Sequence, residues 1–246
     1  MSNQDSSNQL FQVNTDHTEV DEADFLARSR SGLPMVISDD RSDYLDTSVV
    51  ASKYYNGFNF LKLPAEFRRL QMAFGITSSQ RGEGKTLVAA NMAVSLAKAY
   101  ELKTVIVDLN FIKPRMHKIF GVKNTPGVVE VFQGKQMKLT QTKIENLYVV
   151  PAGDISGYSP DVNDLSILRK LINTLKDSFE FVIVDMNSIF PIKDYPVLFA
   201  NEMDGLLTVV DTQRTKQEDL DKIYRHLDEE QVIGYIFNKM DKRNTY

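Results

Sequence analysis

Short apolar runs rich in valine and isoleucine alternate with longer amphipathic segments through most of the chain beyond residue 63. The runs that this pattern predicts as strands are 72–76, 104–109, 147–150, 181–185, 205–211 and 233–238. Helix-length segments such as 166–179 and 217–230 separate most of them. Strands that are apolar on both faces and alternate with helices are typical of a parallel sheet covered on both sides. The sequence therefore predicts the α/β fold class, with a mostly parallel central sheet and helices on both faces.

The first of these apolar runs is followed by a turn rich in serine and glycine and then by a helix-forming segment. Residues 72–90 read MAFGITSSQRGEGKTLVAA, which is the strand, loop and helix context of a phosphate-binding P-loop. In such a loop the backbone N–H groups and the positive end of the following helix bind anions. The pattern G-x-x-x-x-G-K-[ST] departs at one position, because Ser79 stands where its first glycine is usual. We therefore expect a P-loop NTPase that binds a nucleoside triphosphate.

The residues of this loop have separate expected roles in nucleotide binding. Glycines at 82 and 84 let the backbone approach phosphate oxygens without a Cβ in the way. Lys85 is expected to reach the terminal phosphates, and the Thr86 hydroxyl is expected to be a ligand of Mg²⁺. The residues predicted to bind the nucleotide are Ser79, Arg81, Gly82, Glu83, Gly84, Lys85, Thr86, Leu87 and Asn238.

Two aspartates end predicted strands and are expected close to Lys85, because ligands bind beyond the carboxyl ends of parallel strands. Asp185 is predicted to be the Walker-B carboxylate that holds Mg²⁺, directly or through water. Asp108 is predicted either to orient or deprotonate the attacking group, or simply to start the turn that follows it. The predicted catalytic residues are Lys85, Asp108 and Asp185, and the predicted metal ligands are Thr86, Asp108 and Asp185.

Residues 238–241 follow the last predicted strand and read N-K-M-D, like the sequence with which GTPases read guanine. Four residues match easily by chance, so this short sequence leaves guanine specificity unsupported. Because Asn238 ends a strand at the same edge of the sheet as the loop, we expect its side chain to lie near the base of the nucleotide.

The composition narrows the class of protein. The chain has 246 residues, no run of 18 apolar residues and no basic start followed by an apolar stretch, so neither a transmembrane helix nor secretion is expected. The absence of cysteine excludes disulfides and Cys-ligated zinc, and the three histidines are too far apart in sequence to suggest a metal cluster. A net charge of −4 argues against broad binding to nucleic acid. We expect a soluble cytoplasmic protein.

Residues 1–57 differ in composition from the rest of the chain. They are rich in Ser, Asn and Asp, and residues 1–27 carry six acidic side chains and no Lys or Arg. Such a segment buries little apolar surface, which predicts a flexible acidic and polar leader with at most a short helix over 20–30. Residues 58–246 are predicted to form the P-loop nucleotide-binding domain, which begins with a helix over 65–74.

Ordered segments of the chain resemble the bacterial tyrosine kinases of capsule and exopolysaccharide synthesis, within the MinD/ParA-type P-loop ATPases. The resemblance runs through the segments 77–99, 105–121, 125–135, 146–153, 179–187, 204–215 and 234–241. It implies ATP and Mg²⁺ as cofactors, with adenine preferred to guanine. The family tolerates a residue other than glycine at position 79, and its Walker-A′ element is the strand that carries Asp108.

The chain departs from this family at positions that matter for kinase chemistry. Asn110 stands in place of the second Walker-A′ acid, and residues 112–113 are Ile-Lys where a pair of arginines is usual. The segment 185–188 reads D-M-N-S instead of D-T-P-P. Tyr246 stands alone where the family has a terminal cluster of tyrosines. The resemblance therefore supports nucleotide binding more strongly than tyrosine phosphorylation.

The resemblance also bears on assembly. The family's subunit-contact pattern E-x-x-R-x-x-R keeps Glu66 and Arg69 here but has Met72 at its third position. A homo-oligomer weaker or smaller than a closed ring is therefore expected. The family's membrane-spanning half is missing from this sequence, which implies a stand-alone form that docks on a membrane chain-length or co-polymerase-type protein. Through that partner, a cytoplasmic protein would be peripheral at the inner membrane.

These observations favour an ATP-binding cytoplasmic regulator of exopolysaccharide or capsule synthesis or export, which resembles a stand-alone tyrosine autokinase with degenerate kinase activity. The first alternative is an active protein-tyrosine autokinase, which the P-loop and the two strand-ending aspartates allow. The second alternative is a MinD/ParA-type spatial organiser. It ranks last because Gln80 and Arg81 stand where that class often has a signature lysine.

Overall fold

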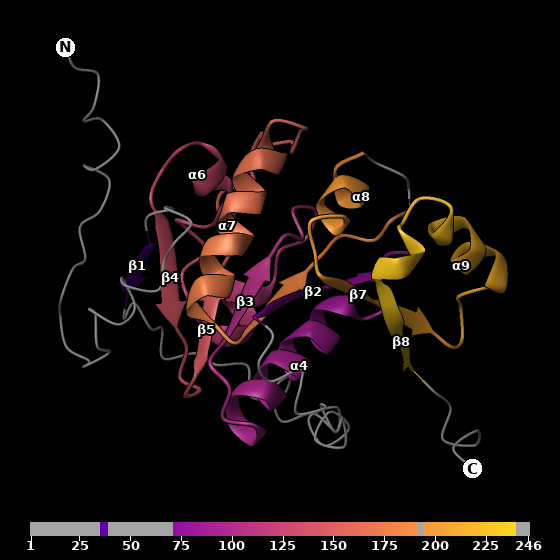
Figure 1. The fold of residues 1–246 in the computed structure, drawn as a ribbon, viewed down its shortest axis with the longest axis horizontal. Helices are drawn as coiled ribbons and strands as arrows, with labels where there is room; N and C mark the ends of the chain where they lie inside the picture. The colour runs from indigo at the N-terminus through magenta and orange to yellow at the C-terminus, as the bar shows by residue number, and fades with distance from the viewer. Residues whose placement is uncertain (1–34, 39–70, 191–193, 240–246) are drawn as a thin grey trace.

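The strands form one eight-stranded sheet in the order β1-β4-β5-β3-β6-β2-β7-β8 (Figure 1). The structure is a computed structural model that describes residues 35–38, 71–190 and 194–239. The strands are β1 Met35–Ser38, β2 Met72–Ser78, β3 Thr104–Asp108, β4 Met137–Gln141, β5 Leu147–Val150, β6 Phe181–Asp185, β7 Gly205–Asp211 and β8 Val232–Asn238. Neighbouring strands run parallel except for β4 and β5. This arrangement confirms the predicted α/β class with a mostly parallel sheet.

Helices cover both faces of this sheet, as predicted (Figure 1). They are α4 Lys85–Ala99, α5 Met116–Phe120, α6 Val128–Phe132, α7 Asp164–Ser178, α8 Asp194–Ala200 and α9 Gln217–Tyr224. Helices α4 and α5 bury apolar side chains in a cluster on one face, and α6, α7, α8 and α9 do so on the other. No helix in the described ranges is both long and apolar enough to cross a membrane.

The central strands end side by side at the carboxyl edge of the sheet. Strands β3 and β6 read TVIVD and FVIVD and are buried along their whole length, because helices cover both of their faces. Their last residues, Asp108 and Asp185, are register partners, and Ile76 of β2 pairs with Asp185 on the other side. The loop that follows β2 therefore begins beside Asp185, with Asp108 on the next strand beyond it.

Six of the eight strands correspond to predicted runs, and the hydrophobic pattern missed β1 and β4. Strand β1 lies inside the segment 1–57 that was predicted as a leader, and it pairs with β4. The rest of that segment, with the short helix over 20–30, falls outside the described residues, so the predicted domain boundary stays a prediction. Strand β4 is half-buried at Lys138 and Gln141, so it lacks the wholly apolar run of a central strand.

Two predicted helices end in different places from those expected. The helix over 65–74 is wrong for residues 72–74, which begin β2, while 65–70 falls outside the described residues. The predicted helix over 217–230 is also too long, because α9 ends at Tyr224 and a short 3₁₀ turn follows at Glu229–Gln231. In the second case the amphipathic pattern continues beyond the residue at which α9 ends.

Candidate functional site

The loop between β2 and α4 passes twice through a left-handed backbone conformation, at Gly82 (φ +87°) and Gly84 (φ +101°). A Cβ at Gly84 would lie 2.1 Å from Asn238 Nδ2, so this position has room for glycine alone. At Gly82 the nearest atom to such a Cβ would be Arg214 Nη1, at 3.4 Å. Glycine at these two positions leaves the loop without Cβ atoms there, so a phosphate group can approach the backbone N–H groups.

Glu83 places its carboxylate within the loop, where the residue is 1% exposed. That carboxylate accepts hydrogen bonds from Ser79 Oγ at 2.9 Å, from the Gln80 backbone N–H at 2.7 Å and from the Thr215 hydroxyl. Ser79, which departs from the P-loop pattern, is therefore a donor that ties the start of the loop to its end. The sequence analysis missed this brace because Thr215 lies 132 residues away from Glu83.

Lys85 is the first residue of α4 and is buried at the base of the loop. Its Nζ donates to Ser78 Oγ at 3.0 Å, which holds the ammonium at the end of β2. Burial lowers the pKa of Lys85, and the carboxylates of Asp185 and Glu83 oppose that shift. An ammonium has three donors, so a buried one that bonds this hydroxyl can still donate to an anionic oxygen.

Thr86 and Asp185 meet beneath the loop. Thr86 Oγ1 donates to Asp185 Oδ2 at 2.7 Å, and Asn110 Nδ2 lies 3.4 Å from Thr86 Oγ1. Asp185 is completely buried, and its Oδ1 has no hydrogen-bond partner among the described residues. Burial, together with the nearby Asp108 carboxylate, raises the pKa of Asp185 to about 8. An unsatisfied, buried carboxylate oxygen beside a hydroxyl is a donor set that suits a hard cation such as Mg²⁺.

Asp108 holds the turn that follows β3. Its Oδ1 accepts the Asn110 backbone N–H at 3.0 Å, and its Oδ2 accepts the N–H groups of Arg115 and Met116, also at 3.0 Å. Burial raises the pKa of Asp108 to about 6, although these three N–H groups oppose the shift. Of the two roles expected for Asp108, the structure shows the turn, and its part in metal binding and catalysis stays a prediction.

The N-K pair at the end of β8 contacts the loop backbone. Asn238 Nδ2 donates to the Glu83 carbonyl at 2.8 Å. Lys239 Nζ donates to the Gly82 carbonyl at 2.8 Å and pairs with Asp211 Oδ2 at 2.6 Å. The predicted position of Asn238 near the base stays a prediction, because both ends of its side-chain amide bond backbone groups here. Asp241, the last residue of N-K-M-D, falls outside the described residues.

The structure thus gathers the predicted residues at one edge of the sheet. Arg81 is exposed on the loop, and Leu87 is half-buried in the first turn of α4. Three residues that bond to the loop or fix its partners were not predicted: Asp211, Thr215 and Lys239. Asp211 ends the apolar run GLLTVVD, so the strand-end signal that identified Asp185 also marks it.

Known proteins resemble this chain in sequence and in fold. A family model described as the CobQ/CobB/MinD/ParA nucleotide binding domain (CbiA) matches residues 74–246. The tyrosine-protein kinase CpsD of Streptococcus pneumoniae is 29% identical over 203 residues, which cover 78% of this chain and 85% of that protein. The succinoglycan biosynthesis transport protein ExoP of Rhizobium meliloti (strain 1021) is 29% identical over 174 residues, 68% of this chain and 22% of ExoP. The crystal structure of the chimerical protein CapA2B2 matches with a TM-score of 0.62 at 25% identity, covering 88% of this chain and 98% of that one.

Proposed function

The chain belongs to the CobQ/CobB/MinD/ParA family of nucleotide-binding domains, and we propose that the loop between β2 and α4 binds ATP together with Mg²⁺. The observation that carries this proposal is the Thr86–Asp185 hydrogen bond of 2.7 Å directly beside the buried Lys85. It supports the proposal because a cation, a hydroxyl and a carboxylate lie together beside the loop whose N–H groups would receive a phosphate chain. In P-loop NTPases the lysine binds the phosphates, and the hydroxyl and the carboxylate hold Mg²⁺.

Thr86 and Asp185 are the residues that would hold the metal ion. A Mg²⁺ ion commonly takes one or two protein oxygens and completes its shell with phosphate oxygens and water. Bound there, the ion would neutralise negative charge on the phosphates, and Lys85 would add a second positive charge. Because an adjacent cation favours the ionised form of a carboxyl group, metal binding would lower the raised pKa of Asp185.

The relatives indicate the process in which this binding is used. CpsD is named a tyrosine-protein kinase and ExoP a succinoglycan biosynthesis transport protein. We infer that this chain is a cytoplasmic regulator of exopolysaccharide or capsule synthesis or export, whose ATP-bound form acts on a membrane co-polymerase-type partner. Docking on that partner would hold it at the inner membrane, and a homo-oligomer is part of the same proposal.

Tyrosine phosphorylation is expected to be slow or absent. The amide of Asn110 lies 3.4 Å from Thr86 Oγ1, at the metal-binding end of the site, where a second acid would add a negative charge. Asparagine keeps the shape of aspartate but neither carries that charge nor accepts a proton, and losing such a role typically slows a reaction roughly 10²–10⁴-fold. An active protein-tyrosine autokinase is the alternative. The residues that favour it are Lys85, Thr86, Asp108 and Asp185.

Calorimetric titration and mass spectrometry separate these two functions. We expect Mg-ATP to bind the purified protein, GTP to compete poorly, and protein from its native host to carry little phosphotyrosine. Abundant phosphotyrosine that disappears in a Lys85→Ala variant would establish the kinase instead. An Asn110→Asp variant tests the physical reason, since a restored acid should raise ATP turnover if the missing charge is what limits it.

A further inference from the structure

Two neighbouring side chains at the end of β8 hold consecutive peptide groups of the loop. The Glu83 carbonyl accepts a hydrogen bond from Asn238 Nδ2, and the Gly82 carbonyl accepts one from Lys239 Nζ, both at 2.8 Å. We propose that Asn238 and Lys239 are positioning residues that aim two backbone N–H groups of the loop at the phosphates. This inference rests on the proposed binding of ATP to the loop.

The planar peptide group links those carbonyls to the N–H groups that would bind phosphate. In a trans peptide the C=O and the N–H point in opposite directions. The Gly82 carbonyl shares its peptide with the Glu83 N–H, and the Glu83 carbonyl shares its peptide with the Gly84 N–H. A donor that holds each carbonyl toward β8 therefore turns the following N–H away from β8. Successive N–H groups turned the same way form the concave nest that binds an anion, and the positive φ angles at Gly82 and Gly84 suit such a nest.

Strand β7 holds the two positioning residues in place. Lys239 Nζ makes its 2.6 Å ion pair with Asp211, whose side chain is fully buried at the end of β7. The Thr212 N–H donates to the Asn238 carbonyl at 3.1 Å, and Gln213 Nε2 donates to the Lys239 carbonyl at 2.9 Å. Burial alone would raise the pKa of Asp211. The pKa is nevertheless held below its usual range by the hydrogen bond from Lys239, the hydrogen bond from the Gln213 N–H and the positive charge of Lys239. Because an ammonium has three donors, Lys239 can bond Asp211 and the loop at the same time.

If Lys239 contributed only to stability, its ion pair with Asp211 would be sufficient, and its bond to the loop would not be needed. The chain contains an ion pair of the same length at the opposite end of β7, where Lys176 Nζ lies 2.6 Å from Oδ2 of the partly exposed Asp204. That lysine makes an ion pair of the same length, but it lies at the opposite edge of the sheet from the loop. The bond to the Gly82 carbonyl is the feature that distinguishes Lys239, and it is the feature that a nucleotide titration can measure.

The test compares Lys239→Met with Lys176→Met, and it uses calorimetric titration of Mg-ATP, Mg-ADP and AMP. We expect Lys239→Met to weaken ATP and ADP binding about tenfold, the effect of losing one charge-assisted hydrogen bond, and to leave AMP binding unchanged. Lys176→Met is expected to bind ATP like the wild type. Lys239→Arg is expected to recover most of the affinity, because it keeps a cationic donor at this position.

Asn238→Ala is the second variant, and it is expected to weaken ATP binding roughly 3–10-fold through the loss of one neutral hydrogen bond. It keeps the inference testable if circular dichroism shows that Lys239→Met does not fold. Wild-type ATP affinity in a folded Lys239→Met or Asn238→Ala variant would overturn the inference. Failure of the wild-type protein to bind ATP would instead overturn the proposed function, so the two outcomes are distinguishable.

Discussion

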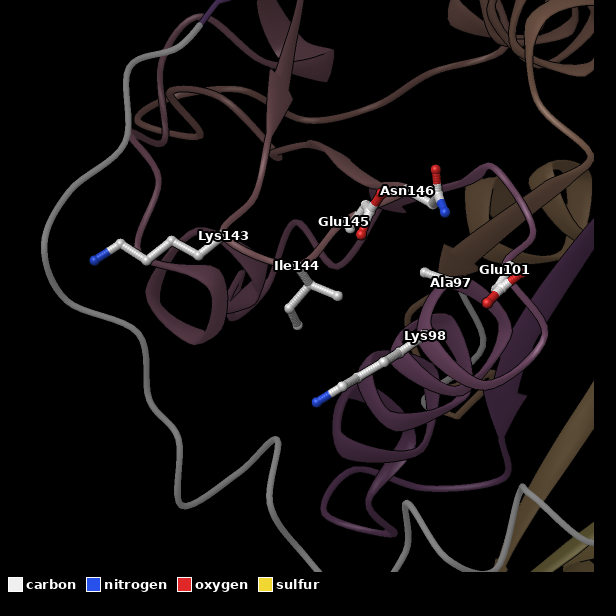
Figure 2. A pocket seen from close by; sticks show the side chains of 7 residues that line it. All are labelled: Ala97, Lys98, Glu101, Lys143, Ile144, Glu145 and Asn146. Atoms are coloured by element: carbon white, nitrogen blue, oxygen red, sulfur yellow. The ribbon is translucent and has the colours of Figure 1, made fainter.

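The carboxyl and amino edges of the sheet differ in whether their polar side chains are buried and bonded to one another. At the carboxyl edge, buried polar groups bond one another around the loop, among them Ser79, Glu83, Lys85, Asp185 and Asn238. The amino edge carries a hollow of about 530 Å³, lined by Ala97, Lys98, Glu101, Lys143, Ile144, Glu145 and Asn146. In Figure 2 the charged side chains around this hollow spread apart and do not gather at one point. Buried and mutually bonded polar groups, rather than the size of a hollow, therefore distinguish the edge at which we propose that the nucleotide binds.

The backbones of the two edges differ at Gly84. Both edges contain residues with positive φ: Gly82, Gly84 and Lys239 (φ 57°) at the carboxyl edge, and Glu101 (φ 56°) and Asn146 (φ 62°) beside the hollow. A Cβ at Gly84 would lie 2.1 Å from Asn238 Nδ2. At Lys239 and beside the hollow, residues with side chains occupy the left-handed conformation. Close approach by Asn238, in addition to the left-handed conformation, is what favours glycine at position 84.

The largest expected effect comes from removing the cation at the carboxyl edge. We expect Lys85→Ala to weaken Mg-ATP binding roughly 10–100-fold, because charge-assisted hydrogen bonds to phosphate contribute about 1.5–3 kcal/mol each. Lys98→Ala, at the hollow, is the matched control and is expected to leave the affinity unchanged. Isothermal titration calorimetry measures both, and unchanged affinity in Lys85→Ala would remove the loop from the binding site.

A methyl group added at Gly84 tests whether ATP binding depends on the close approach of Asn238 to the loop backbone. We expect Gly84→Ala to weaken ATP binding roughly 3–10-fold, because the new Cβ would displace Asn238 from the Glu83 carbonyl and remove one neutral hydrogen bond. Gly134→Ala is the control, since Gly134 also has a positive φ of 79° but no atom within 4 Å of such a Cβ. The control is expected to lose about 1 kcal/mol of stability and no ATP affinity. Equal ATP binding by the two variants would contradict the comparison between the edges.

Much of the fold could be predicted from local sequence. Strands β3 and β6 are runs of valine and isoleucine that end in aspartate, and both of their faces are buried. Strand β4 could not be predicted in this way, because it reads MKLTQ and pairs antiparallel with β5. Strand β1 has four residues within a polar segment, and its pairing with β4 is what identifies it.

The site divides in the same way between local and distant contacts. The P-loop and Asp185 are local signals, so sequence alone predicted them. Thr215 bonds the Glu83 carboxylate from 132 residues away, and Lys239 bonds the Gly82 carbonyl from 157 residues away. No local pattern indicates which group a distant side chain will bond. The turn held by Asp108 was one of two roles that its sequence allows, and three hydrogen bonds show it, while the other role stays a prediction.

The buried carboxyl of Asp185 predicts a pH dependence that begins at the carboxyl edge. Its pKa is raised, so the native state binds this proton more tightly than the unfolded chain does. The contribution of Asp185 to stability is therefore fully present below the unfolded pKa and is lost as pH rises through its folded pKa of about 8. We expect the melting temperature of nucleotide-free and Mg²⁺-free protein to fall by at least about 3 °C between pH 6 and pH 9.

The Asp185→Asn variant supplies the control for this pH dependence. Asparagine cannot ionise, so this variant is expected to show a flatter profile, while Asp221→Asn on the exposed surface of α9 should keep the wild-type slope. Differential scanning calorimetry gives the melting temperatures. A wild-type slope that survives in Asp185→Asn would mean that another group titrates.

The smallest expected effect belongs to the amino edge. Glu101 follows the end of α4 with φ 56°, and the adjacent Leu102 N–H bonds the Leu96 carbonyl at 3.1 Å. A left-handed conformation costs a residue with a Cβ roughly 1–2 kcal/mol, and replacement by glycine removes this cost. Glycine also raises the entropy of the unfolded chain, which offsets part of the stabilisation. We therefore expect Glu101→Gly to stabilise the protein by about 0.5–1 kcal/mol in urea denaturation, with ATP affinity unchanged. Because asparagine tolerates this conformation, Asn146→Gly should gain less. If Glu101→Gly altered ATP binding, α4 would couple the two edges of the sheet. The amino edge would then also affect nucleotide binding, and the two edges would differ in position but not in function.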